Sequence, residues 1–309
     1  IMKLTVLGLC GQSVFLEVEH FHVPGETIHA KSLHSEPGGK GFNQAVAASR
    51  LGAEVSFFTC VGQDGEGTAC LEFLKKEGVY PIAQVDASSR TAYACVLTDC
   101  VGENRVTVYQ GASSKMTPEF IREKREVFAQ SDLLLLNNEY PMDCNVAVLE
   151  LAEQYGIPAI LNPAPAQKID MELLRKFFLI TPNYSEAISL LGEPANCVRH
   201  LPALFRAKGI CRAVVTLGRG GALLIDGEQT ISFPALPSRA RDTTGAGDAF
   251  NAALAVSLMS GSSLEKAVEY AINVAALSVR EPYVMPGLPT KQQVKLNFKP
   301  VHPREMEEL

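Results

Sequence analysis

Asp242-Thr-Thr-Gly-Ala-Gly-Asp248 is the most informative segment of the chain, and an apolar segment with helical character, Ala249–Leu258, begins directly after it. Small residues leave backbone N–H groups open at a helix start, and that end of a helix carries partial positive charge, so such a turn attracts phosphate. Asp248 taken alone fits a helix-capping role, since Asp is favoured near helix starts. Beside an anion-binding turn, its carboxylate can also accept the proton of a hydroxyl during phosphoryl transfer.

A second glycine-rich segment, Pro37–Gly41, precedes Asn43 and an apolar helical pattern. Proline and three glycines suit a strained turn whatever its function. The functional alternative is that the bare backbone of Gly38 and Gly39 approaches a polyhydroxylated ligand, whose hydroxyls bind the Asn43 amide and Lys40. The segment is not a Walker A loop, because Gly41 follows the lysine where Ser or Thr is required.

Together, the two segments resemble the C-terminal and N-terminal signatures of the ribokinase family of sugar and nucleoside kinases, also called the PfkB family. One glycine-rich match is weak evidence because such turns are common, but two long matches in the expected order are strong evidence. The resemblance covers residues 3–290. It implies an ATP-dependent kinase that phosphorylates a hydroxyl of a small sugar, with Asp248 as the base and Gly245, Ala246 and Gly247 as the anion-binding turn.

The length of 309 residues allows two average domains or one large α/β domain, and the resemblance implies a single kinase domain over residues 1–309. Apolar strands at 133–137, 159–162, 178–181 and 213–217 alternate with helices near 143–155, 170–176, 184–191 and 197–208. This alternation predicts an α/β fold of three layers (α/β/α), in which helices cover both faces of a mostly parallel sheet and ligands bind beyond the carboxyl ends of the strands. Segments of about 12–36 and 88–111 do not fit this alternation, and the resemblance implies that they form a small β lid over the site.

Polar residues that follow the strands supply further candidates. Glu139 ends an apolar strand and is either a solvated loop residue or, as the resemblance implies, a sugar-binding carboxylate. Asn183 and Glu186 fit a capping box, and the resemblance adds a role in organising Mg²⁺, phosphate and water. The remaining assignments implied by the resemblance are Thr216, Gly218 and Gly221 for ATP binding, where a plain β-turn is the alternative, and Asp242 for a monovalent cation such as K⁺, where a structural role is the alternative.

The chain departs from the family pattern at two places. Ribokinases have an Asn-x-Asp pair soon after the first strand, whose Asp binds sugar hydroxyls, and here Gly11 and Ser13 take these positions. A neutral serine binds a hydroxyl less strongly than a carboxylate does, so we expect ribose to be a poor substrate. The second departure is Glu281-Pro-Tyr-Val284, where relatives often have a Lys-Gly-Ala-type loop that helps bind potassium.

Composition narrows the remaining possibilities. The net charge of −6 and the absence of a basic run give no support for nucleic-acid binding, and no apolar stretch is long enough to span a membrane. The eight cysteines form no C-x-x-C pair, so we expect a reducing cytoplasm and no zinc site. The expected partners are a small-molecule sugar, ATP and a second copy of the chain, bound through the β lid as the resemblance implies.

Two other functions stay open from the sequence. A nucleoside kinase would need an apolar pocket for the base, built from lid residues such as Phe15 or Tyr93. A non-catalytic sugar- or nucleotide-binding protein would use the same scaffold, but it has no need of a base at Asp248.

Overall fold

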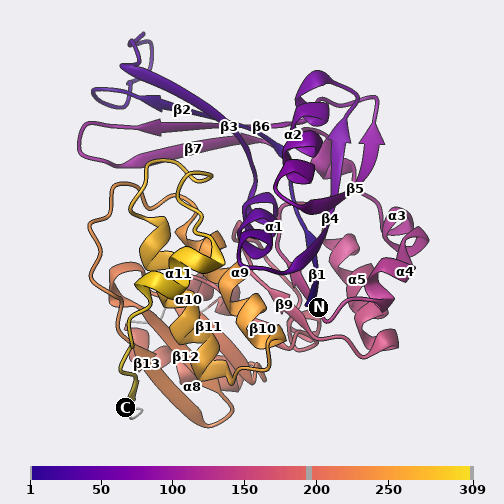
Figure 1. Ribbon diagram of the computed structural model, residues 1–309, viewed down its shortest axis with the longest axis vertical. Helices are drawn as coiled ribbons and strands as arrows, with labels where there is room; N and C mark the ends of the chain where they lie inside the picture. Colours follow the sequence, from indigo (N-terminus) through magenta and orange to yellow (C-terminus); the bar gives the residue numbers. More distant parts are fainter. Residues whose placement is uncertain (1, 193–196, 307–309) are drawn as a thin grey trace.

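The computed structural model describes residues 2–192 and 197–306, and within them a large twisted sheet forms the centre of the molecule (Figure 1). Neighbouring strands from β11 to β5 pair in parallel, whereas β12, β13 and β14 pair antiparallel at one edge. The strands, in spatial order, are β14 (Arg304–Glu305), β13 (Gln229–Phe233), β12 (Ala222–Asp226), β11 (Arg212–Thr216), β10 (Leu179–Ile180), β9 (Ala159–Leu161), β8 (Leu133–Leu136), β1 (Lys3–Leu7), β4 (Glu54–Gly62) and β5 (Val79–Asp86).

Helices cover both faces of this sheet, because alternate strand residues point to opposite sides. In β8, Leu133 and Leu135 join one apolar core while Leu134 and Leu136 join the other. One face is covered by α1 (Lys40–Arg50), α2 (Gly65–Lys76), α9 (Ala246–Met259), α10 (Leu264–Ser278) and α11 (Lys291–Asn297). The other is covered by α3 (Pro118–Glu123), α4 (Arg125–Ala129), α5 (Met142–Tyr155), α6 (Met171–Leu174), α7 (Tyr184–Leu191) and α8 (Leu201–Ala207). The predicted three-layer α/β/α fold is therefore confirmed.

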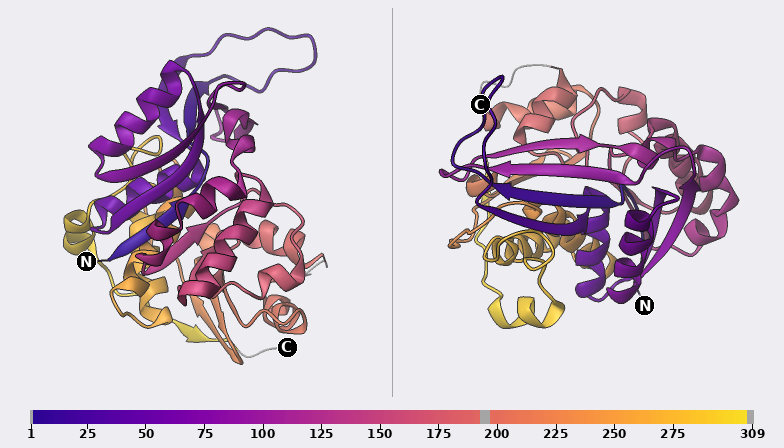
Figure 2. Two further views of the ribbon diagram at one scale, coloured as in Figure 1. Left: turned by 90° about the vertical axis from the view of Figure 1, so that its right-hand side faces the viewer. Right: turned by 90° about the horizontal axis from the view of Figure 1, so that it is seen from above.

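A second, four-stranded sheet projects from this body, and we call it the lid (Figure 1; Figure 2, right). Its strands, in spatial order, are β3 (Ser32–Gly38), β2 (Gly11–Glu17), β6 (Ala92–Thr98) and β7 (Asn104–Tyr109). Two antiparallel pairs, β2 with β3 and β6 with β7, are joined by a parallel pairing of β2 with β6.

The two faces of the lid differ in burial. Phe15, Glu36 and Val96 lie on the inner face and are at most 7% exposed. Leu33 and Tyr109 lie on the outer face and are 68% and 54% exposed. The inner face is therefore covered at β2, β3 and β6, whereas apolar side chains are uncovered on the outer face and, at Val106 and Val108 of β7, on the inner face as well.

Several elements escaped the sequence prediction. The edge strand β5 contains Pro81, a residue that strands tolerate at an edge and that weakens the strand signal. The short helices α3 and α4 were also missed. The C-terminal segment from Lys291 is polar and charged in sequence, yet α11 and the chain after it bury Val294 and Val301 against the core. No helix among the described residues has the length and apolar character needed to cross a membrane.

Candidate active site

Asp248 lies in the first turn of α9 and is only 6% exposed. Its Oδ2 accepts a hydrogen bond from Nδ2 of Asn43 at 2.8 Å, and its Oδ1 accepts one from Nε2 of Gln44 at 3.2 Å. Burial raises the pKa of the Asp248 carboxyl, while Lys40 and the two amide donors oppose this rise. The fold has thus brought the two glycine-rich segments, 205 positions apart between Asn43 and Asp248, into direct contact.

Hydrogen bonds connect this carboxylate to further buried amide side chains. Gln44 also donates to Oδ1 of Asn162 at 3.2 Å, and Asn162 donates to the carbonyl oxygen of Thr181 at 2.9 Å. Asn251 donates to the carbonyl oxygen of Gly247 at 2.8 Å, which fixes the turn that carries the candidate anion hole. Among the described residues, Oε1 of Gln44 and Oδ1 of Asn43 accept no hydrogen bond, so the network still has two buried acceptors open.

Lys40, the first residue of α1, lies among three carboxyl groups. Burial lowers the pKa of Lys40, but the negative charges of Asp248, Glu139 and Glu186 outweigh this effect and raise it. Lys40 therefore stays protonated and is the positive charge that these three candidate residues share.

Glu139 follows β8 and is buried, and its carboxylate binds backbone amides. Its Oε1 accepts from the N–H of Lys40 at 2.7 Å, and its Oε2 accepts from the N–H groups of Leu9 and Gly41 at 3.0 Å each. Burial raises the pKa of Glu139, and these amides and Lys40 oppose the rise. A carboxylate has about four acceptor positions, so one remains for a sugar hydroxyl, and sugar binding by Glu139 stays a prediction.

The Gly38–Gly39 turn lies between Ser13 and Asn43. A methyl group at Gly38 would lie 2.9 Å from Oγ of Ser13 and 3.6 Å from Oδ1 of Asn43, so only glycine leaves this space open. Within the described residues, the buried Oδ1 of Asn43 accepts no hydrogen bond. A buried acceptor without a donor is costly, and a sugar hydroxyl at this place would pair with it.

The candidate nucleotide residues gather at the ends of β10 and β11. Asn183 and Thr216 form an isolated parallel bridge between these two strand ends. Asn183 and Glu186 form the predicted capping box, with two hydrogen bonds of 2.8 Å. Gly218 and Gly221 both have positive φ, and a methyl group at Gly221 would lie 1.9 Å from the Phe233 carbonyl oxygen. The turn therefore requires glycine there for its own geometry, and ATP binding by these residues stays a prediction.

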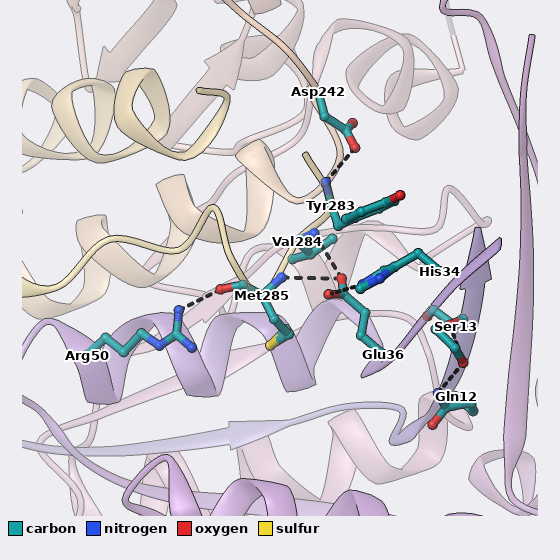
Figure 3. Close-up of polar contacts among 10 residues, drawn as sticks. Gln12, Ser13, His34, Glu36, Arg50, Asp242, Tyr283, Val284 and Met285 are labelled. Atoms are coloured by element: carbon teal, nitrogen blue, oxygen red, sulfur yellow. Dashed lines mark hydrogen bonds and ion pairs between the residues drawn. The ribbon is translucent and has the colours of Figure 1, made fainter. Parts of the chain in front are cut away.

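Asp242 lies at the edge of the site, beside the loop that follows α10 (Figure 3). Its Oδ1 accepts from the N–H and the hydroxyl of Thr244 at 2.9 and 2.7 Å, and its Oδ2 accepts from the N–H of Tyr283 at 2.9 Å. The structural role that the sequence left open is thus present, and the cation role is untested.

The lid offers no apolar pocket for a nucleobase from the two residues suggested by the sequence. Phe15 is 7% exposed and packs edge-on against Tyr283, with ring centroids 5.3 Å apart. Tyr93 lies on the outer face of the lid, because the strand register places its side chain on the face opposite to that of Phe15. One side chain is thus covered and the other lies on the opposite face of the lid, so these two residues give the nucleoside-kinase alternative no support.

Sequence reasoning missed Gln44 and Glu36. Gln44 directly follows Asn43 within the same glycine-rich motif at the start of α1. This position could have indicated that it belongs to the site. Glu36 accepts hydrogen bonds from two backbone N–H groups of the loop that follows α10. Nothing in the sequence pairs it with a loop 248 positions away.

Comparisons of the sequence and of the structure with known proteins point to the same family. Residues 2–291 match the model of the pfkB family of carbohydrate kinases. Ribokinase of Bacillus subtilis is 36% identical over 296 residues, which cover 95% of this chain and 98% of that protein, and ribokinase of Haemophilus influenzae is 33% identical with coverage of 94% and 96%. The crystal structure of ribokinase from Thermotoga maritima matches with a TM-score of 0.85 at 32% identity, covering 96% of this chain and 99% of that one. The Arabidopsis thaliana ribokinase complexed with ribose and ATP matches with a TM-score of 0.86 at 29% identity and the same coverage.

Proposed function

The chain belongs to the pfkB family of carbohydrate kinases, and we propose that it transfers the terminal phosphoryl group of ATP to a hydroxyl of a small sugar, with Asp248 as the base. The single observation that carries the assignment is the contact between Asp248 and the Asn43–Gln44 pair. A buried base is thereby held beside an amide whose Oδ1 accepts no hydrogen bond among the described residues, and we propose that a sugar hydroxyl pairs with this oxygen. The Arabidopsis relative was solved with ribose and ATP, which supports both substrate classes.

The proposed reaction follows from the positions of the residues. The sugar binds at Ser13, the Gly38–Gly39 turn and Asn43, with its acceptor hydroxyl toward Asp248. Asp248 takes the hydroxyl proton as the oxygen attacks the terminal phosphorus of ATP. The backbone N–H groups of Gly245 and Gly247, at the positive end of α9, stabilise the charge on the transferred group. The N–H of Ala246 donates to the carbonyl oxygen of Thr243 at 3.3 Å, and it must leave this long bond to take part. ADP then leaves from the side of Asn183 and Thr216.

We propose that Mg²⁺ enters together with ATP and neutralises its phosphates. Among residues 2–192 and 197–306, no group of three or more His, Cys, Asp or Glu side chains is arranged to hold a metal. Glu186, near the nucleotide side of the site, would orient the waters of the magnesium–ATP complex.

The test is a turnover assay with ATP and a panel of sugars and nucleosides, with and without EDTA. We expect phosphorylated sugar in the presence of Mg²⁺, none with EDTA, and recovery when Mg²⁺ is restored. Undiminished turnover without divalent metal, or turnover of nucleosides alone, would contradict the proposal.

Substrate choice is a separate proposal and depends on Ser13. A carboxylate at this position is absent. The neighbouring Glu36 carboxylate is engaged by the N–H groups of Val284 and Met285 and lies 3.2 Å from His34, so it is less available to a sugar hydroxyl than an unbound carboxylate. We therefore propose that ribose is used less well than another small sugar. Loss of one hydrogen bond to a charged group costs roughly 1.5–3 kcal/mol, which is about a ten- to hundredfold lower kcat/KM.

The Ser13→Asp variant tests this proposal, because it restores a carboxylate and should shift preference toward ribose. A double variant with Gly11→Asn is unsuitable, because a methyl group at Gly11 would lie 2.3 Å from the carbonyl oxygen of Ala92. The measurement is kcat/KM for ribose and for the preferred sugar in both proteins. If the unaltered enzyme already prefers ribose over the whole panel, the reading of Ser13 is wrong.

A monovalent cation at Asp242 is a further proposal. The Asp242 carboxylate accepts three hydrogen bonds, so about one of its four acceptor positions remains, and backbone carbonyl oxygens would supply the other ligands. We expect K⁺ to raise kcat relative to tetramethylammonium at constant ionic strength. An equal kcat in both salts would contradict a cation site.

We also propose that the enzyme is a cytoplasmic homodimer that pairs through the lid. ATP is abundant in the cytoplasm, and the eight cysteines are free thiols in this structure, as is usual in reducing compartments. The exposed apolar side chains on the outer face of the lid, including Leu33 and Tyr109, support a partner on that face.

A further inference from the structure

Glu36 ties the lid to the body of the molecule at a point that the reaction steps above do not use (Figure 3). It lies on the inner face of β3, opposite Ser13 in strand register, and is 7% exposed. Its Oε1 accepts from the N–H groups of Val284 and Met285 at 2.9 and 3.3 Å, and its Oε2 lies 3.2 Å from Nε2 of His34. A lid strand is thus attached to the loop that follows α10.

This loop is held by two carboxylates. The N–H of Tyr283 donates to Asp242 at 2.9 Å, while the next two N–H groups donate to Glu36. Tyr283 has a φ of 65°, and among the described residues no other non-glycine residue has a positive φ. Such a conformation is unfavourable for a bulky side chain and persists only where the surroundings hold it. Stacking of the Tyr283 ring on His34, with centroids 3.7 Å apart, adds a further tie to the lid.

Val284 connects this constrained loop to the anion-binding turn. A methyl group at Gly245 would lie 2.6 Å from Cγ1 of Val284, so the valine side chain lies directly against the turn. Gly245 is the residue before α9 and has left-handed geometry, with a φ of 77°. Its position, together with Ala246 and Gly247, determines where the first N–H groups of α9 point.

We propose that Glu36 is a positioning residue that couples closure of the lid to the geometry of the anion-binding turn, an inference that rests on the proposed phosphoryl transfer. The lid strands β2 and β3 carry the sugar-side residues Ser13 and Gly38. Glu36 holds the N–H groups of Val284 and Met285, and the Val284 side chain lies against Gly245. Sugar binding and the readiness of the turn for the transferred phosphoryl group are then linked through one carboxylate.

The test compares Glu36→Ala, Glu36→Gln, Val284→Ala and the Glu36→Ala/Val284→Ala double variant, with Glu17→Gln as the matched control. Glu17 lies on the same face of the lid but is exposed, and its carboxylate binds only Ser32 among the described residues. The measurements are kcat, sugar KM, ADP affinity by calorimetry, and amide hydrogen exchange without sugar at residues 244–248 and 283–285. Each activity is measured well below the melting temperature of the variant concerned.

We expect Glu36→Ala to lower kcat by about 10- to 100-fold, the scale of a misplaced catalytic group, while ADP affinity changes less than threefold. Glu36→Gln keeps one acceptor oxygen for both N–H groups, so it should retain kcat within about threefold of the unaltered enzyme, and Glu17→Gln should match that enzyme. Val284→Ala should lower kcat as well. The double variant should lose little more than Glu36→Ala, because residues that act through one another are not additive. Exchange should become faster at both segments.

Several results would overturn the proposal. These are an unchanged kcat in Glu36→Ala or Val284→Ala, additive losses in the double variant, and faster exchange at 283–285 with residues 244–248 unaffected. If Glu36→Ala does not fold, Val284→Ala and Glu36→Gln decide by the same criteria. If the unaltered enzyme phosphorylates no sugar, the proposed function fails, whereas the exchange experiment still decides whether Glu36 holds the turn.

Discussion

Asp248 shows how one side chain acquires its chemistry from its surroundings. On an exposed helix start it would be an ordinary cap with an ordinary acidity. Here it is buried beside Lys40, and two side-chain amides donate to it. Both amides donate to the carboxylate, which acts as an acceptor. Its remaining lone pairs are available to a substrate hydroxyl.

The first prediction at this scale concerns catalysis. Asp248→Asn keeps the shape of the side chain but removes the base, so kcat should fall on the order of 10²–10⁴-fold. The affinity for ADP should be unchanged, because the nucleotide residues lie at β10 and β11. Steady-state kinetics on the best sugar, together with calorimetry for ADP, checks both statements. A kcat close to that of the unaltered enzyme would remove Asp248 from the mechanism.

The second prediction concerns pH. Asp248 must be ionised to act, and burial raises its pKa, so kcat/KM should fall with decreasing pH at a higher pH than an ordinary aspartate, with a pKa of about 3.9, would give. The folded protein holds this proton more tightly than the unfolded chain does, so protonation of Asp248 favours folding, and the lost activity does not arise from unfolding driven by this group.

Burial also raises the pKa of Glu186. The fall of kcat/KM at low pH, the acid limb of the profile, must therefore be assigned to one of these carboxyl groups. The residual activity of Asp248→Asn should lack the limb. Persistence of the same limb in that variant would assign it to another carboxyl group.

At the scale of elements, Glu139 joins the end of β1 to the start of α1. Its carboxylate accepts hydrogen bonds from the N–H groups of Leu9, Lys40 and Gly41. The first N–H groups of a helix have no partner within the helix, and no side chain caps α1 at Gly39. Glu139 therefore supplies the cap from the loop that follows β8, and this fixes the glycine-rich turn against the sheet.

The third prediction tests this clamp. Glu139→Gln turns one acceptor into a donor that faces a backbone N–H, which should lower the free energy of unfolding by roughly 2–4 kcal/mol. Glu153→Gln is the matched control on the exposed face of α5, and it should change stability by less than about 0.5 kcal/mol. Urea denaturation of both variants gives the comparison. Equal midpoints would show that the clamp contributes nothing to stability.

The same scale explains what the sequence could and could not predict. Buried parallel strands such as β8, with four consecutive leucines, can be predicted from their composition. The capping box at Asn183 and Glu186 was also readable, because its residues are three positions apart. The Glu139 clamp, the Gln44–Asn162 contact and the Glu36 tie join segments between 98 and 248 positions apart. Local patterns contain no information about such contacts, which depend on the packed fold.

At the scale of the whole molecule, the lid is both a cover for the site and an exposed sheet. Its inner face reaches the body through Glu36, Phe15 and Tyr283. Its outer face exposes Leu33, Tyr93 and Tyr109 at 68%, 43% and 54%. A sheet with an uncovered apolar face loses stability in water, and burial of that face against a second lid would recover about 25 cal/mol for each Å² covered. If the lids pair as proposed, we expect the stiffness of the lid to increase on association.

The last prediction follows from this dependence. The unaltered enzyme should sediment as a particle of twice 33.4 kDa, and Leu33→Glu combined with Tyr109→Glu should give single chains, because two buried carboxylates on the paired face are costly. Val101→Glu is the matched control, since Val101 is 77% exposed in the turn between β6 and β7 and lies outside the sheet face. Analytical ultracentrifugation over a range of micromolar concentrations measures the mass, and kinetics on the same samples measures the sugar KM. We expect the single-chain variant to show a raised KM, because an unsupported lid encloses the sugar less often. A single-chain mass for the unaltered enzyme, or a dimer that survives both substitutions, would mean that the outer face of the lid is not the interface.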